Sequence, residues 1–237
     1  MLSLSRQARI AEGHRLYVVG DIHGRFDLLT RLVERIDADM AQAPAAVATE
    51  IYLGDYVDRG PASAQVLRLL IERQRVRNMV CLVGNHEVYM MEALRNRAAF
   101  ESWLPLGARE TLKSFGVQPP SLQSVDSAFR AFGQAIGEAE RRFLNELLPL
   151  HRVGDYLFVH AGVKPGVPLA QQQLTDLTTI RKPFFNAARP FGLIVVHGHT
   201  PVAKVETHAA RINVDTGAYM TGNLSCLVIE PDRLRLL

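Results

Sequence analysis

Cysteine is scarce in this sequence, with two residues among 237, and long apolar runs are absent. Cys81 and Cys226 each lie in an apolar, strand-like segment, so we expect buried thiols instead of a disulfide framework or a zinc knuckle. No segment approaches the roughly 18 apolar residues that cross a bilayer. Residues 1–15 lack the apolar core and the small-residue cleavage site of a signal peptide, which predicts a cytoplasmic protein with no membrane partner.

The sequence also lacks a long run of residues that carry charges of the same sign. The formal net charge is only +3, although the sequence pI is about 9.0. The arginines are scattered along amphipathic helical patterns such as RLVERID and LRLLIERQRVR, which indicates solvated helix faces and no nucleic-acid partner. The sequence contains no GxxxxGK[ST] loop, and this excludes a P-loop nucleotide triphosphatase.

What is present is the composition of a globular chain, with 48% hydrophobic and 22% charged residues. The first part alternates between strand and helix patterns. Apolar runs predict strands over residues 15–19, 51–53 and 79–83, and amphipathic patterns predict helices over 26–40, after Pro61 and over 87–97. This βαβαβα order implies parallel strands joined by right-handed crossovers.

The rest of the chain changes character twice. Residues at about 98–151 have helical patterns broken by prolines and a glycine, which we interpret as a helical insert in a single domain spanning residues 1–237. The last third predicts strands over residues 156–160, 193–197, 202–207, 211–214 and 224–230. The sheet system therefore begins as α/β and is expected to finish as a β meander.

Polar clusters follow these strands at the points where they end. GDIHG, GDYVDRG and GNHE come directly after the first three strands, His160 ends YLFVH, and His197, Gly198 and His199 follow LIVV. Ligands of α/β sheets bind beyond the carboxyl ends of the strands, so these loops are expected to share one place. A single histidine or aspartate after a strand is usually structural or a helix cap. Five such strand ends, each beside a glycine, favour a functional site instead.

The donor types suit a pair of cations. Carboxylate, imidazole and amide oxygen together favour Mn²⁺, Fe or Zn²⁺, and no thiolate is offered. Two cations about 3.5–4 Å apart need a bridging oxygen ligand. Asp55 is the natural bridge, because its loop lies between the other two loops in sequence.

The three motifs are followed by His160 at a strand end and then by the pair Gly198-His199. Residues in this order closely resemble the phosphoprotein phosphatase family of metallophosphoesterases. The compact length and HGHTPV look most like the bacterial and phage serine/threonine protein phosphatases. The resemblance implies an α/β (α+β) fold, a four-layer αββα sandwich of the calcineurin-like metallophosphoesterase type. It also implies two divalent metal ions, Mn²⁺ first among them, and six metal ligands: Asp21 and His23 for the first metal, Asp55 for both, and Asn85, His160 and His199 for the second.

The same resemblance implies roles for residues that hold no metal. His86 matches the general acid of the family, and Asp58 matches the residue that orients it. Arg59 matches a phosphate-binding arginine, and Arg181 in TTIRKPF is the candidate for a second one, although the tryptophan often found upstream is absent. His197 has no counterpart among the ligands, so we expect a structural imidazole there.

The function implied is hydrolysis of phosphate monoesters by a metal-bridging hydroxide, with phosphoserine or phosphothreonine proteins or small phosphoesters as substrates. One alternative stays in the same superfamily, namely a hydrolase of diadenosine tetraphosphate, although VDRG and GNHE favour the phosphatase side. A second alternative is a non-catalytic module that keeps the metal site. Such proteins normally lose a ligand or the acid, and this sequence retains them all.

Overall fold

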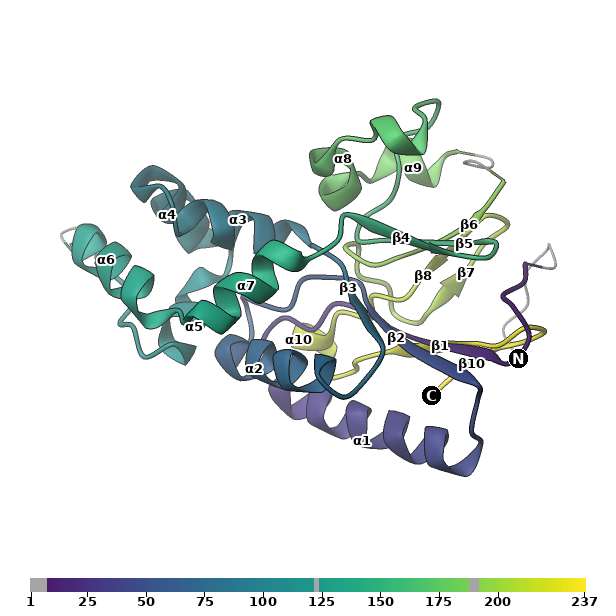
Figure 1. Ribbon diagram of the computed structural model, residues 1–237. Helices are drawn as coiled ribbons and strands as arrows, with labels where there is room; N and C mark the ends of the chain where they lie inside the picture. The colour runs from purple at the N-terminus through teal and green to yellow at the C-terminus, as the bar shows by residue number, and fades with distance from the viewer. Residues whose placement is uncertain (1–7, 122–123, 188–191) are drawn as a thin grey trace.

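The computed structural model describes residues 8–121, 124–187 and 192–237. These residues form two five-stranded sheets that pack face to face, with helices on both outer faces (Figure 1). The first sheet has the order β10-β9-β1-β2-β3, with β1 at His14–Val19, β2 at Val47–Tyr52, β3 at Met79–Cys81, β9 at Cys226–Ile229 and β10 at Leu234–Leu236. The second has the order β4-β5-β6-β8-β7, with β4 at Leu150–Val153, β5 at Tyr156–Val159, β6 at Ile194–His197, β7 at Glu206–Thr207 and β8 at Arg211–Asn213.

The N-terminal half of the first sheet has the predicted parallel crossovers. Strand β1 pairs in parallel with β2, and β2 with β3. The connections run through helices α1 (Phe26–Gln42) and α2 (Ser63–Gln74), which cover the outer face of this sheet in Figure 1. Parallel pairing places the carboxyl ends of all three strands at one edge of the sheet.

Alternation along the strands explains the four layers. Leu16 and Val18 of β1 belong to the apolar cluster between the two sheets, whereas Tyr17 and Val19 belong to the cluster under α1 and α2. Successive side chains of a strand point to opposite faces, so a strand buried on both faces needs apolar residues throughout. A third cluster lies between the second sheet and two short helices, α8 (Leu174–Thr179) and α9 (Lys182–Phe185). The αββα prediction is confirmed by this arrangement.

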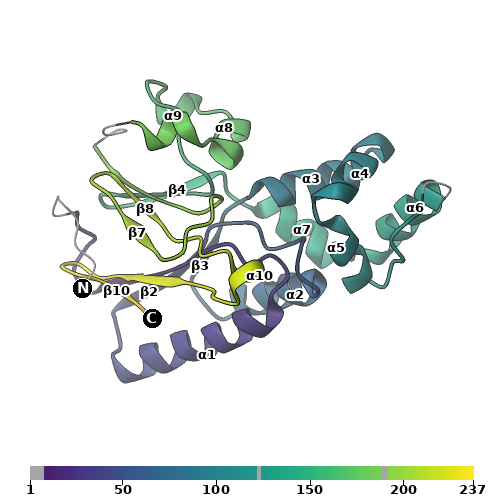
Figure 2. The ribbon, with the colours of Figure 1, turned by 180° about the vertical axis from the view of Figure 1, so that it is seen from behind.

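The segment between β3 and β4 is helical and extends to one side of the sandwich (Figure 2). It contains α3 at Asn85–Ala93, α4 at Arg97–Trp103, the 3₁₀ turn η1 at Leu104–Leu106, α5 at Ala108–Ser114, α6 at Val125–Ala135 and α7 at Glu138–Glu146. The described helices include none with the length and apolar character that crossing a membrane requires.

Several predicted boundaries were wrong. The helix expected over 87–97 is two helices, because the Asn96 side chain accepts hydrogen bonds from Ala98 N and Ala99 N and so starts α4 anew. The strand expected over 202–207 is reduced to the two residues of β7. Strands β4 and β10 were not predicted, and β4 overlaps the expected end of the helical segment.

The expected β meander was also wrong. Strands β5 and β6 pair in parallel, as do β6 and β8, and the connection from β5 to β6 passes through α8 and α9. A parallel pair requires such a crossover, which the turn residues near Gly162 and Gly166 concealed. Strands β9 and β10 return to the first sheet, where β9 pairs antiparallel with β1. Both cysteines are free and buried, as predicted.

Candidate metal centre

Six strands from the two sheets end at the same place. The loops after β1, β2 and β3 carry the three glycine-rich motifs, and the residues after β5, β6 and β8 face them from the second sheet. Backbone hydrogen bonds join these loops: His23 N donates to Asp55 O over 2.8 Å, and Gly198 N donates to His160 O over 2.7 Å. Residues far apart in the sequence are therefore held in one rigid cluster.

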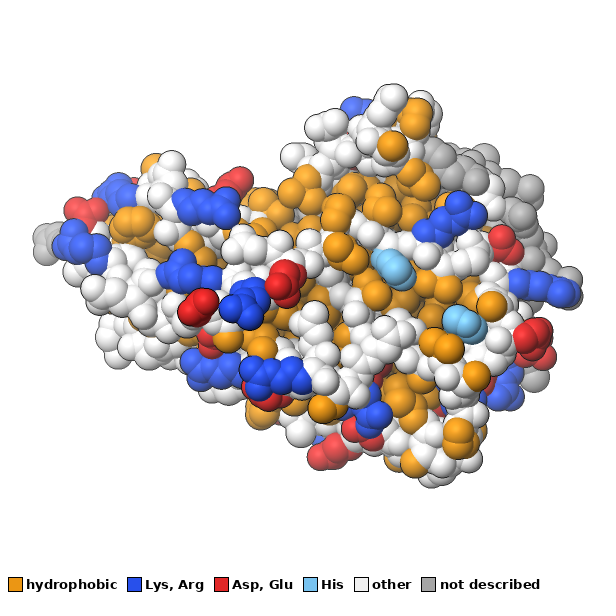
Figure 3. Space-filling model, in the orientation of Figure 1, with side chains coloured by type: hydrophobic (Ala, Val, Ile, Leu, Met, Phe, Trp, Pro, Cys, Tyr) orange, Lys and Arg blue, Asp and Glu red, His pale blue; other side chains and the backbone are white. Residues whose placement is uncertain are grey.

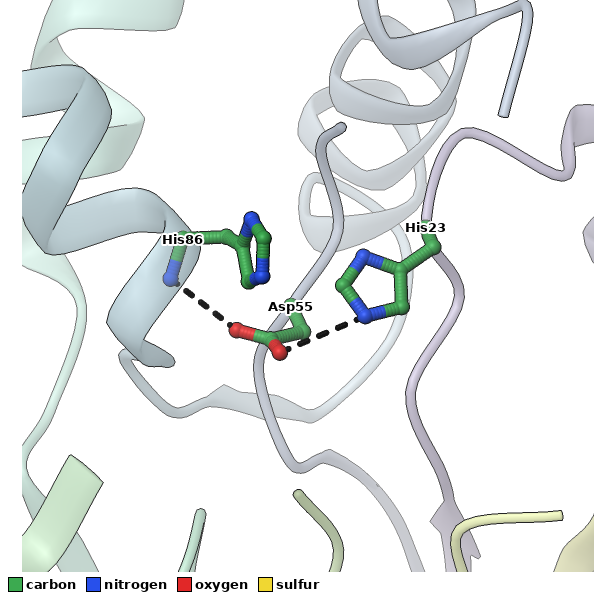
Figure 4. A group of neighbouring side chains, drawn as sticks. All are labelled: His23, Asp55 and His86. Atoms are coloured by element: carbon green, nitrogen blue, oxygen red, sulfur yellow. Dashed lines mark hydrogen bonds and ion pairs between the residues drawn. The ribbon is translucent and has the colours of Figure 1, made fainter. Parts of the chain in front are cut away.

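One group of potential ligands contains His23, Asp55 and His86, whose ligand atoms all lie within 4.8 Å of one another. His23 Nε2 lies 3.4 Å from Asp55 Oδ2, as Figure 4 shows. The other carboxylate oxygen, Asp55 Oδ1, accepts a hydrogen bond from the backbone N–H of His86 over 3.1 Å. Asp55 is thereby fixed with both oxygens facing the centre.

A second group contains Asp55, His160 and His199, within the same 4.8 Å limit. His160 Nε2 lies 3.5 Å from Asp55 Oδ1 and 3.2 Å from Asn85 Oδ1. Asp55 is the residue that the two groups share. Of the six predicted ligands, four belong to these two groups: His23, Asp55, His160 and His199. Asn85 adjoins them through His160, and Asp21 through the backbone of His199.

The tautomers of the two deepest histidines show what the centre can hold. His23 Nδ1 lies 2.8 Å from the carbonyl of Val57, and His160 Nδ1 lies 2.9 Å from the carbonyl of Leu53. A carbonyl only accepts, so each Nδ1 carries the proton and each Nε2 presents a lone pair. Burial keeps both rings neutral, lowering the pKa of His23 to about 3 and lowering that of His160 as well. Imidazole lone pairs that lie beside carboxylate and amide oxygens are suited to bind a cation.

Asp21 supports the same interpretation. Its Oδ2 accepts a hydrogen bond from His199 N over 3.0 Å, whereas its Oδ1 is buried without a hydrogen-bond partner among the described residues. Burial and the neighbouring Asp215 raise the pKa of Asp21 well above its ordinary value. A Cβ on Gly198 would collide with Oδ1, which is why glycine precedes His199. An orphaned carboxylate oxygen and this donor set fit divalent cations.

His86 has a carboxylate partner apart from Asp55. Its Nδ1 lies 2.7 Å from Asp58 Oδ2, and its Nε2 has no hydrogen-bond partner in the described part of the chain. Burial opposes the charged imidazole, but Asp55 and the hydrogen-bonded Asp58 outweigh it and raise the pKa of His86. Trp103 Nε1 and Thr111 Oγ1 donate to the Asp58 carboxylate over 2.7 and 2.6 Å. An imidazole held in this way can carry a proton at Nε2.

Two exposed arginines flank the centre, each beside a different ligand group. Arg59 Nη1 donates to His23 Nε2 over 3.0 Å, and Arg181 Nε donates to His199 Nε2 over 3.3 Å. The Arg59 guanidinium also lies over the ring of Tyr219, 4.8 Å from its centroid. The aromatic ring therefore packs against one face of the guanidinium group of Arg59, which is an exposed residue.

Backbone strain is concentrated in the same loops. Among the described residues, positive φ values at non-glycine positions occur at His23, Asp55, Asp58, Arg59 and His199, between 46° and 71°. Such conformations cost of the order of 1–3 kcal/mol each and persist only where the surroundings enforce them. All five positions belong to the site predicted from the sequence.

His197, for which a structural role was predicted, lies in an apolar environment. The ring is fully buried between Phe184 and Phe185, its Nδ1 lies 3.1 Å from Gly198 O, and its Nε2 has no partner among the described residues. Burial lowers its pKa to about 3. It is a neutral imidazole that packs behind the ligand loop.

Four residues that contribute to the site were not predicted: Glu87, Trp103, Asp215 and Tyr219. Asp215 follows β8 in the string NVDTG, so the strand-end rule applies to it once β8 is known to run parallel to β6. Glu87 belongs to GNHE, but its role emerges only from the backbone donors that surround it. No sequence signal connects Trp103 or Tyr219 to the site, because only the fold brings them there.

Comparison with known families gives a match over residues 14–223, to the family described as calcineurin-like phosphoesterase.

Curated relatives carry names of three kinds. A zinc-dependent endopolyphosphatase of Saccharomyces cerevisiae is 27% identical over 190 residues, covering 75% of this chain and 56% of the relative. A symmetrical bis(5'-nucleosyl)-tetraphosphatase of Dechloromonas aromatica is 29% identical over 150 residues, covering 63% and 44%.

An asymmetrical bis(5'-nucleosyl)-tetraphosphatase, PrpE of Bacillus velezensis, is 22% identical over 231 residues and covers 88% of this chain and 86% of its own. The chain thus spans about half the length of the first two relatives and most of the third. Two solved structures share the fold. A provisionally assigned diadenosine tetraphosphatase has a TM-score of 0.62 at 20% identity, covering 99% of this chain and 95% of its own. A cold-active protein tyrosine phosphatase has a TM-score of 0.64 at 15% identity, covering 98% and 78%.

Proposed function

Because this chain belongs to the calcineurin-like phosphoesterase family, we propose that it is a two-metal hydrolase that cleaves phosphoanhydride bonds in dinucleoside polyphosphates. The observation that carries the proposal is the position of Asp55 in both candidate ligand groups. A carboxylate shared between two cations suits the in-line displacement at phosphorus that two-metal sites catalyse.

The metal ligands in this proposal are the six residues predicted from the sequence: Asp21, His23, Asp55, Asn85, His160 and His199. Their oxygen and imidazole donors suit Mn²⁺, Fe or Zn²⁺, and one relative is named for its dependence on zinc. Bound cations would supply Lewis-acid chemistry, polarising phosphoryl oxygens and lowering the pKa of water to roughly 7.

The arginines bind the substrate in this proposal. Arg59 and Arg181 lie beside histidines of different ligand groups, and both side chains are exposed. The planar guanidinium group binds phosphate oxygens through two parallel hydrogen bonds. Two such groups on either side of the centre are suited to a chain of phosphates, in which the phosphoryl group under attack has a charged neighbour.

His86 is the general acid in the proposal. Asp58 fixes its Nδ1, which leaves the proton on Nε2 for the oxygen of the leaving group. A phosphate leaving group needs this proton less than an alkoxide does, because phosphate is far less basic. The acid pair is therefore compatible with both anhydride and ester substrates, although an ester depends on it more.

The choice of anhydride rests on the relatives. The endopolyphosphatase and both tetraphosphatases are named for substrates whose phosphates are joined by anhydride bonds. The main expectation from the sequence was instead a phosphate monoesterase acting on phosphoserine or phosphothreonine. A phosphate monoesterase is the second candidate function. It is supported by the paired His86 and Asp58, which suit an alkoxide leaving group.

A substrate panel tests the proposal on the full chain loaded with Mn²⁺ or Zn²⁺. The panel contains diadenosine tetraphosphate, inorganic polyphosphate, p-nitrophenyl phosphate and a phosphothreonine peptide. We expect kcat/KM for diadenosine tetraphosphate to exceed that for the peptide by about 100-fold or more, equivalent to roughly 2.8 kcal/mol of differential transition-state binding. Chromatography of the products shows whether cleavage is symmetrical, giving ADP, or asymmetrical, giving ATP and AMP.

The other outcomes are equally distinct. A preference for the phosphopeptide would reject the anhydride proposal in favour of the second candidate. Two bound metals without hydrolysis of any substrate would indicate the non-catalytic module instead. The Asp55→Asn variant serves as the control, because activity that survives this substitution comes from a contaminating enzyme.

A further inference from the structure

Asp215 is a buried carboxylate beside the metal centre that has no role in the proposed mechanism. It follows β8, which pairs in parallel with β6, so it lies at the strand end next to that of His199. Its Oδ1 accepts a hydrogen bond from Gly217 N over 2.8 Å. Its Cβ and Asp21 Oδ1 lie beside the same glycine, 3.5 and 2.1 Å from the position that a Cβ on Gly198 would occupy. Within the described part of the chain, neither carboxylate forms an ion pair.

Two buried carboxylates on either side of one glycine repel one another unless a proton or a cation lies between them. The Asp21 side chain is at least nine-tenths buried, and its Oδ1 lacks a hydrogen-bond partner among the described residues. The predicted ligands are also unequal in number. Three of them serve only the second metal, whereas Asp21 and His23 alone serve only the first.

We propose that Asp215 is a further carboxylate ligand of the first metal, which it holds together with Asp21, His23 and Asp55. This inference rests on the two-metal centre of the proposed function. It explains why an additional acid is buried against Asp21, since a divalent cation offsets the repulsion between the two carboxylates. It also places three carboxylates around the first metal, while the second keeps one shared carboxylate, one amide and two imidazoles.

The two sites would then prefer different metals. Oxygen-rich sites suit Mn²⁺ or Mg²⁺, and sites with more imidazole suit Zn²⁺. Asp215 is the residue that would create this difference. Without it the first site has two carboxylates and one imidazole.

Titration calorimetry with Mn²⁺ on the metal-stripped full chain tests the inference, with elemental analysis giving the metal content. Asp215→Asn removes the charge but keeps an oxygen that can accept from Gly217 N, so the turn is preserved. We expect wild type to bind two Mn²⁺ per chain. In the variant, the affinity of one site should fall by about 10–100-fold while the other stays unchanged. Asp232→Asn, an exposed acid outside the ligand groups, is the matched control.

Thermal unfolding gives a readout that a purely structural role would not produce. Without metal, Asp215→Asn should unfold at a midpoint no lower than that of wild type, because the substitution removes the repulsion between the carboxylates. Added Mn²⁺ should then raise the midpoint of the variant less than that of wild type. A lower metal-free midpoint with unchanged Mn²⁺ affinities would overturn the inference and leave Asp215 as a turn residue.

The failures of the two proposals can be told apart. Two unchanged affinities in Asp215→Asn would overturn this inference alone, whereas a wild-type chain that binds neither Mn²⁺ nor Zn²⁺ would overturn the two-metal function as well. A crystal structure of the Mn²⁺-loaded wild-type chain needs no variant. An Asp215 oxygen at roughly 2.0–2.2 Å from the cation supports the inference, and a separation of more than about 3 Å overturns it.

Discussion

The indole Nε1 of Trp103 donates a hydrogen bond over 2.7 Å to Asp58 Oδ2, the same oxygen that lies 2.7 Å from His86 Nδ1. Trp103 ends α4, in the helical segment between β3 and β4, whereas Asp58 belongs to the loop after β2. Thr111 of α5 donates to the other oxygen of the same carboxylate. The helical segment therefore fixes the position of Asp58, and through Asp58 it orients His86, the proposed acid.

This relationship predicts the effect of Trp103→Phe. The substitution removes one hydrogen bond to a buried charged group, which is worth about 1.5–3 kcal/mol, and loosens the carboxylate that orients His86. We expect kcat for an alkyl phosphate to fall by about 10–100-fold while the metal content is unchanged. Phe100→Leu disturbs the same aromatic cluster without touching Asp58 and is the control. Equal losses of kcat in the two variants would contradict the prediction.

His86→Asn tests the proposed acid through the leaving group. General acid catalysis contributes typically 10²–10⁴-fold, and its share grows with the basicity of the leaving oxygen. We therefore expect a loss of about 10²–10⁴-fold in kcat for an alkyl phosphate, and a smaller loss for diadenosine tetraphosphate or p-nitrophenyl phosphate. Steady-state kinetics on metal-loaded protein measure this. The same loss for every substrate would show that His86 does not donate a proton to the leaving group.

Asp55→Asn tests the shared ligand. Asp55 lies in both ligand groups, so removing its charge weakens both sites at once. We expect at least one metal per chain to be lost after dialysis, together with activity on every substrate. Elemental analysis measures the metal, and circular dichroism verifies that the variant is folded. Full occupancy by two metals in this variant would rule out a bridging role.

The predicted metal ligands could be chosen from the sequence because each one lies within a few residues of the end of a predicted strand. The parallel order of β1, β2 and β3 then forces the first three loops together, and the structure places Asp55 at their centre. Asp215 obeys the same rule but follows β8, which was expected in a meander where strand ends alternate in direction. The error in topology therefore hid the carboxylate.

Other features depend on contacts that no local pattern records. The break at Asn96 separates α3 from α4, and it places Trp103 on a helix that turns back toward Asp58. Tyr219 reaches Arg59 across 160 residues of sequence, an interaction set by the packing of the short helix α10 (Ala218–Thr221). Pairings of such long range follow from the fold, so they could not be predicted from the periodicity of single segments.

The acid stability of the chain should depend in part on Asp37. Hydrogen bonds from Arg73, with further help from Arg77, lower the pKa of this carboxyl below its ordinary value. A depressed pKa in the folded state means that the pair stabilises the chain above the unfolded pKa of about 3.9, and that this stability is lost as pH falls through the folded pKa. Asp37 is 38% exposed, so screening limits its contribution to less than about 1 kcal/mol.

Denaturant unfolding of wild type and Asp37→Asn across pH 2–7 measures this effect, at a constant salt concentration of about 0.1 M. We expect the variant to be less stable near neutral pH and to converge with wild type at the acid end. A difference that stays constant over the whole range would show that the carboxylate stabilises the chain through packing and not through its charge.

The last prediction concerns Glu87, whose buried carboxylate organises the loop that carries Asp55. One oxygen accepts from Asp55 N and Gly84 N over 2.7 and 3.0 Å, and the other accepts from Tyr56 N and Val57 N over 2.7 and 3.3 Å. Glu87→Gln would point an amide NH₂ at two backbone donors and leave them unpaired. Each unpaired buried group costs about 1–3 kcal/mol.

We therefore expect Glu87→Gln to lose about 2–4 kcal/mol of unfolding free energy and to bind metal more weakly, because the strained loop at Asp55 relaxes. Glu92→Gln makes the same change at an exposed position of the same helix, α3, and should leave both quantities unchanged. Urea unfolding with an unchanged m-value measures the stability, and calorimetry measures the metal affinity. Wild-type stability in Glu87→Gln would mean that backbone donors tolerate the amide, and that the carboxylate does not hold this loop.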